Sequence, residues 1–99
     1  GMSEYTMSMT VVEVCQCARL PLDTLVEIVD TGIVEPTGSR PQEWLFDSQM
    51  VVVIQKAHRL QRDLETDWNG VALALGLLDE LRSVRAENDR LRRLIATAG

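Results

Sequence analysis

Residues 10–36, TVVEVCQCARLPLDTLVEIVDTGIVEP, decide the fold because they hold the start and stop signals of two consecutive helices. The segment TVVE at residues 10–13 is a capping box, in which the side chains of Thr10 and Glu13 can each accept a backbone N–H of the first turn. The pattern predicts a short helix from Thr10 to about Cys17.

The second helix has its own boundary signals. Pro21 suits a helix start, where its missing N–H is not needed, and Gly32 suits a left-handed C-cap. Two short helices joined by a tight turn predict a helix-turn-helix. The expected apolar stripe of the second helix is Leu22, Leu25, Val26 and Val29.

Short extended segments are predicted on both sides of this unit. Tyr5, Met7 and Met9 alternate with polar residues, which indicates a half-exposed strand. After the second helix, residues 37–41 (TGSRP) have turn chemistry and residues 44–46 (WLF) return as a strand. We therefore expect a small β-hairpin wing, with Trp44 packing the hairpin on the third helix or contacting a partner.

Two further helices complete the predicted architecture. Asp47 should cap a helix at Ser48–Leu64, and Asp67 should cap a last helix from Trp68 to about Ala96 that could bend at Gly76. Residues expected to point inward from the third helix are Val51, Val52, Ile54, Leu60 and Leu64. The fold class is thus mostly α, with a winged helix-turn-helix and a long C-terminal coiled-coil helix.

The C-terminal stretch has the period of a coiled coil. Its seam residues are spaced 4, 3, 4, 3, 4 and are Leu77, Leu81, Val84, Asn88, Leu91 and Ile95. An Asn inside such a seam fixes register, so the pattern predicts a specific homodimer. The chain would then divide into an interaction domain at residues 1–75 and a dimerisation helix at 76–99; the alternative is that the stripe folds back on its own domain.

The charge is distributed unevenly along the chain. Residues 1–54 hold eight acidic and two basic residues, whereas residues 55–99 hold eight basic and seven acidic residues. Residues 20–39 contain neither Lys nor Arg. DNA binding depends on cationic side chains that neutralise phosphates, so the sequence predicts no direct nucleic-acid binding. A DNA-binding regulator remains the alternative.

Enzymatic and metal-binding residues are sparse. Cys15 and Cys17 are expected to be free thiols, and His58 is the only histidine, so we predict neither a metal site nor a cofactor. No nucleophile and base share a suitable spacing, which indicates that the protein is not an enzyme. The lack of an apolar membrane span and of a signal-peptide pattern at Gly1–Tyr5 predicts a cytoplasmic protein without a membrane partner.

The order of helices, wing and capping Asp resembles the DNA-binding domain of the MerR family over residues 5 to about 75. Val26, Glu27 and Ile28 occupy positions where that family carries Arg and Tyr for phosphate contact. Four segments resemble the CbpM family of chaperone modulators more closely: LVEIVxxGIVEP (25–36), WLFD (44–47), LxxDWxGVALAL (64–75) and ENxxLR (87–92). The resemblance implies a binder of the J-domain of CbpA, a DnaJ-like co-chaperone, that blocks its action with the Hsp70 DnaK.

The resemblance does not fix the contact residues, so they are predicted from charge and spacing. Asp23, Glu27 and Asp30 fall at i, i+4 and i+7 and should form an acidic ridge on the second helix, which is either a docking surface or an ordinary solvated face. Trp68 is either a core residue or an interface anchor. The remaining candidates are Asp63 and Asp67.

Overall fold

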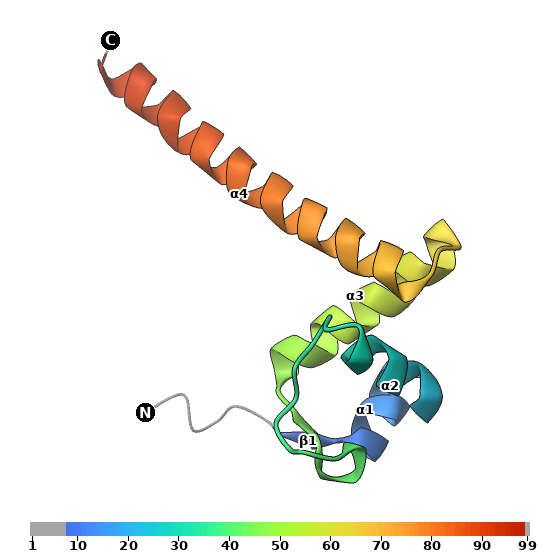
Figure 1. The fold of residues 1–99 in the computed structure, drawn as a ribbon. Helices are drawn as coiled ribbons and strands as arrows, with labels where there is room; N and C mark the ends of the chain where they lie inside the picture. The colour runs from blue at the N-terminus through green and yellow to red at the C-terminus, as the bar shows by residue number, and fades with distance from the viewer. Residues whose placement is uncertain (1–7, 99) are drawn as a thin grey trace.

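Four α-helices and two short strands make up the computed structural model of the protein, which describes residues 8–98. In order, the elements are β1 (Met9–Thr10), α1 (Val11–Ala18), α2 (Leu22–Asp30), the 3-10 helix η2 (Pro41–Glu43), β2 (Leu45–Phe46), α3 (Ser48–Leu64) and α4 (Trp68–Ala98). Figure 1 shows a rounded body from which α4 projects. The predicted mostly helical architecture is confirmed. Met9 of the predicted first strand lies in β1, whereas Tyr5 and Met7 lie outside the described residues.

Helix α1 begins with the predicted capping box. The N–H of Glu13 donates to Oγ1 of Thr10 at 3.3 Å, and the N–H of Thr10 donates to Oε1 of Glu13 at 2.9 Å. The bonds from Thr10 hold the pKa of Glu13 below its ordinary value, because they stabilise the charged carboxylate. The helix ends at Arg19, which has the left-handed φ of +57°.

Helix α2 has the predicted boundaries but a different buried face. Pro21 is its N-cap, and Gly32 follows its C-terminus with a φ of +86°. The fully buried side chains are Leu25 and Ile28, whereas Leu22, predicted to face the core, is 53% exposed. The face that carries Leu25 and Ile28 is buried because α2 packs against both α1 and α3.

The wing differs in detail from the predicted hairpin. Strand β2 pairs antiparallel with β1, Met9 opposite Phe46 and Thr10 opposite Leu45. The returning segment also forms a single bridge to Thr37, through N–H···O bonds of 3.2 and 3.0 Å with Leu45. Between these residues the chain makes the turn η2, so the wing hairpin is reduced to one bridge.

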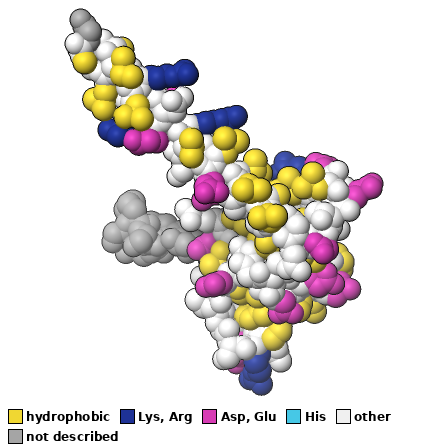
Figure 2. Space-filling view, turned by 45° about the horizontal axis from the view of Figure 1, so that its top comes forward, with side chains coloured by type: hydrophobic (Ala, Val, Ile, Leu, Met, Phe, Trp, Pro, Cys, Tyr) yellow, Lys and Arg dark blue, Asp and Glu magenta, His cyan; other side chains and the backbone are white. Residues whose placement is uncertain are grey.

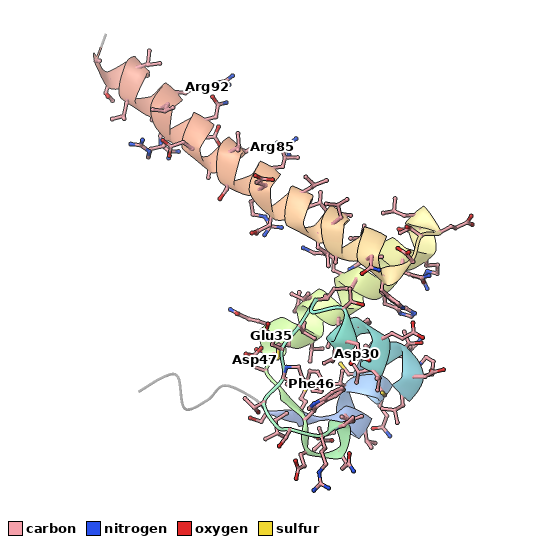
Figure 3. The ribbon with its side chains drawn as sticks, in the orientation of Figure 1. Asp30, Glu35, Phe46, Asp47, Arg85 and Arg92 are labelled. Carbon is pink, nitrogen blue, oxygen red and sulfur yellow. The ribbon has the colours of Figure 1, made fainter. Side chains whose placement is uncertain are left out.

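One apolar core joins the first three helices to the start of α4. Trp44 packs against this core and meets Phe46 edge to face at a ring separation of 6.2 Å. Figure 3 shows Phe46 among the elements of the rounded body. In α3, Val51 and Ile54 are buried as predicted, but Val52 and Leu64 are more than half exposed. The six largest fully buried side chains are Phe46, Leu25, Ile28, Ile54, Val14 and Val71.

The first part of helix α4 packs on α3, and the helix then extends away from the body (Figure 1). The helix runs through Gly76 without a break, so the possible bend there does not interrupt it. Every described residue from Gly76 onward is exposed. None of the helices within residues 8–98 is both long and apolar enough to span a membrane.

Candidate protein-interaction surface

The acidic ridge of Asp23, Glu27 and Asp30 lies on the exposed side of α2, opposite the buried Leu25 and Ile28. Asp23 lies in the first helical turn, where a negative charge is favourable. Asp30 is the last helical residue, where the negative end of the helix dipole opposes a carboxylate, and the last turn carries no basic residue. Helix stability therefore gives no reason for an acidic residue at position 30.

Trp68 and Glu27 are 41 residues apart in the sequence and meet directly. The indole Nε1 of Trp68 donates to Oε2 of Glu27 at 2.6 Å. The Trp68 side chain is half-buried and packs against the core. This contact ties the start of α4 to α2, so Glu27 is a link between two helices as well as a member of the acidic ridge.

The remaining predicted contact residues lie on either side of the α3–α4 turn. Asp63 is exposed on α3. Asp67 precedes α4 and caps its first turn, because its Oδ1 accepts the N–H of Gly70 at 2.9 Å. A Cβ at position 70 would overlap the side chain of Thr66, which explains why glycine fits there. Asp67, Trp68 and Gly70 thus build the helix junction together.

The structure adds an apolar surface that the sequence reasoning missed. Two neighbouring hollows, of about 370 and 300 Å³, share Val11, Val12 and Leu22 as lining residues. Val12 is 64% exposed. The other lining residues are Thr10, Cys15, Gln16, Leu20, Pro21, Pro41 and Gln42. We call this surface the α1–α2 groove. In the sequence, only the adjacent valines Val11 and Val12 indicated it, because one face of a helix cannot bury two consecutive side chains.

The acidic ridge begins directly beside this groove. Leu22, which lines both hollows, is followed by Asp23, and Val12 is followed by Glu13. Figure 2 shows Asp and Glu side chains on the rounded body, more of them toward the right of the view, with exposed hydrophobic side chains among them. An apolar surface flanked by carboxylates suits a partner that presents apolar and basic side chains together.

All six residues of the predicted coiled-coil seam are exposed on α4. Its apolar members are between 43% and 73% exposed, and Leu78 and Leu94 add to the exposed apolar area. Figure 2 shows hydrophobic side chains along this helix, interrupted by charged ones. Arg90 and Glu87 pair at 2.6 Å on the helix surface, and this bond lowers the pKa of Glu87.

Comparison with known proteins assigns the chain to a family. The sequence model of the MerR helix-turn-helix family of regulatory proteins matches residues 9–93. The chaperone modulatory protein CbpM of Pseudomonas putida (strain W619) is 50% identical over 78 residues, which cover 79% of this chain and 77% of that protein. CbpM of Escherichia coli O1:K1 / APEC is 36% identical over 95 residues, which cover 96% of this chain and 94% of that protein. This chain belongs to the MerR-like CbpM family.

The second helix of the helix-turn-helix of this CbpM family member is acidic. Helix α2 carries no Lys or Arg. In the wing, Arg40 is paired with Glu43 at 3.2 Å, which offsets its charge. The face that reads DNA in basic helix-turn-helix proteins is therefore acidic in this chain.

The described part of this CbpM family member contains two cysteines, Cys15 and Cys17. Burial raises the pKa of the Cys15 thiol, which keeps it protonated and poorly nucleophilic. Cys17 is exposed, and both cysteines are free. Within residues 8–98, no three His, Cys, Asp or Glu side chains are grouped closely enough to hold a metal ion.

Proposed function

We propose that the protein is a chaperone modulator that binds the J-domain of a CbpA-type co-chaperone and thereby keeps that domain from acting with the Hsp70 DnaK. The observation that carries this proposal is the acidic helix-turn-helix in a chain whose relatives, over most of its length, are named chaperone modulatory proteins. J-domains as a family present a basic helix to Hsp70, so an acidic binder competes for the same helix.

The α1–α2 groove and the acidic ridge together form the proposed docking surface. Leu22 and Val12 offer exposed apolar area that a partner side chain would remove from water. Full burial of such a side chain contributes roughly 1.5–3 kcal/mol. Asp23 and Asp30 would set the orientation and speed of association, because exposed charges act mainly on the rate of encounter. Trp68 would act indirectly, by holding Glu27 in place.

Dimerisation through α4 is the second part of the proposal. The exposed seam would be covered by the same seam of a second copy, with Asn88 setting the register. On this proposal residues 1–75 are the interaction domain and residues 76–99 the dimerisation helix. A dimer in the cytoplasm would then present two docking surfaces to its co-chaperone.

Charge reversal at Asp30 gives the sharpest test. Asp30→Lys replaces an unfavourable charge at the C-terminus of α2 with a favourable one, so the fold should be at least as stable. If the ridge steers a basic J-domain, the same change should slow association by about threefold or more at low salt and reduce its salt dependence. The assay is surface-based kinetics with a purified J-domain of a CbpA-type co-chaperone.

Glu35→Lys is the matched control. It makes the same charge change at another exposed position, which lies outside α2 and outside the acidic ridge. A general charge effect would slow both variants equally, which would contradict the docking role of the ridge. Absence of J-domain binding by the unaltered protein would overturn the proposed function itself.

A DNA-binding regulator is the competing function and makes a distinct prediction. Cationic contacts would release counterions, and a random duplex would then be retarded by low micromolar protein at physiological salt. With an acidic α2 and a paired Arg40, we expect no retardation under these conditions.

A further inference from the structure

A third surface hollow lies between the end of α1 and the C-terminal half of α3, and its character is opposite to that of the α1–α2 groove. Its volume is about 470 Å³, within the size range of small-molecule sites. The lining residues are Cys17, Ala18, Arg19, Gln55, His58, Arg59 and Arg62.

Three arginines and the only histidine of the sequence line this hollow, and no carboxylate does. The protein as a whole carries a formal charge of −5, and Arg19 is one of two basic residues in its first 54 positions. Among the described residues, none of the three arginines forms an ion pair. Neighbouring cations repel one another, so the grouping is unfavourable unless an anion occupies the hollow.

The favourable interaction of positive charge with the C-terminal end of a helix explains only two of the four basic residues in this hollow. Arg19 follows the last residue of α1, and Arg62 lies in the last turn of α3, where positive charge is stabilising. That effect falls off within one turn, and Arg59 lies before the last turn of α3. His58 also lies outside it, so the dipoles do not explain why these residues share one hollow.

The two walls of the hollow are fixed relative to each other. The N–H of Arg19 donates to the carbonyl oxygen of Cys15, which holds this residue in its left-handed conformation. Gln55 of α3 donates through Nε2 to Sγ of Cys17 of α1 at 3.9 Å. The backbones that carry the cations are therefore already in place before a ligand binds.

We propose that this hollow binds the phosphate group of a small phosphorylated molecule. A guanidinium presents paired N–H donors that match phosphate oxygens, and arginines on two walls can reach a tetrahedral group from different directions. A phosphate also carries close to two negative charges at neutral pH, which suits several cations better than a single carboxylate does. This hollow shares no lining residue with the α1–α2 groove, so phosphate binding does not depend on the proposed J-domain binding.

Calorimetric titration with inorganic pyrophosphate is the direct test, with citrate as the polycarboxylate of comparable charge. We expect saturable binding of pyrophosphate that is tighter than that of citrate. Arg59→Glu should weaken pyrophosphate binding by about tenfold or more, since it removes a cation and adds a like charge. Arg93→Glu is the matched control, because Arg93 is exposed on α4 outside both the hollow and the seam, and it should change affinity less than about twofold.

Cys17 supplies a second readout inside the hollow. Occupancy by pyrophosphate should slow alkylation of the exposed Cys17 by iodoacetamide, measured by peptide mass spectrometry. Arg59→Glu should raise the pyrophosphate concentration needed for this protection by the same factor as it weakens binding. Melting curves of both variants should match that of the parent protein, because both arginines are exposed. Absence of saturable binding, citrate binding as tightly as pyrophosphate, or equal losses in Arg59→Glu and Arg93→Glu would overturn the proposal.

Discussion

The bond between Trp68 and Glu27 links the beginning of α4 to the helix-turn-helix, and its removal should loosen this junction. Trp68→Phe keeps most of the apolar ring and removes the N–H donor. Glu27→Gln keeps the size of the side chain and removes its charge. A third variant, Trp68→Ala, removes the packing of the half-buried ring on the core as well.

The expected magnitude follows from the exposure of the pair. A hydrogen bond to a charged group contributes about 1.5–3 kcal/mol when water is excluded. Glu27 is exposed, so we expect a coupling of about 1 kcal/mol. For a domain of this size that corresponds to a loss of roughly 5 °C in melting temperature. Trp68→Ala should cost about 2 kcal/mol, less than the 3–5 kcal/mol of a fully buried ring.

A double-mutant cycle measures the bond itself. Urea unfolding of the parent protein, Trp68→Phe, Glu27→Gln and the double variant, all at one protein concentration, gives the coupling free energy. A coupling within about 0.3 kcal/mol of zero would show that the two side chains act independently, and the link would then contribute nothing to the junction. Trp68→Phe as stable as the parent protein, with the loss confined to Trp68→Ala, would instead assign the whole effect to packing.

Three other predictions follow from separate parts of the molecule. Leu22→Ala should weaken J-domain binding by at least about 1 kcal/mol through faster dissociation. The melting temperature should not change, because Leu22 is exposed. An unchanged dissociation rate would show that Leu22 is not an anchor of the interface. Leu81→Lys combined with Leu91→Lys should halve the mass measured by light scattering, whereas an unchanged mass would contradict dimerisation through the seam. Because the pKa of Glu13 is lowered on folding, its stabilisation is fully present above the ordinary value of 4.5 and is lost as the pH falls through the lowered value. Glu13→Gln should therefore flatten the dependence of melting temperature on pH in this range, and parallel curves for variant and parent would contradict it.

The sequence alone predicted the features that depend on neighbouring residues. The capping box at Thr10 and Glu13, the cap at Asp47 and the positive φ of Gly32 are all as expected, because each is satisfied within one or two turns of chain. The bounds Ser48–Leu64 were predicted for the same reason. Sequence strings also carried the family resemblance, which the similarity to CbpM proteins confirms.

Burial was predicted less well, because periodicity shows that a helix has an apolar face but not where its neighbours end. Leu22, Val52 and Leu64 fit the apolar periods of α2 and α3, yet they lie where no other element covers them. The wing hairpin is reduced for a similar reason. Its return strand finds a longer partner in β1, from a distant part of the sequence.

Only the tertiary structure decided which distant side chains meet. Trp68 and Glu27 are brought together because α4 starts against α2, and Arg19 joins Arg59 because α1 ends beside α3. Such pairings depend on how helices pack against one another, and the local signals of caps and periods contain no information on that packing. The sequence thus determined the order, ends and charge of the helices, while packing determined which charges share a surface.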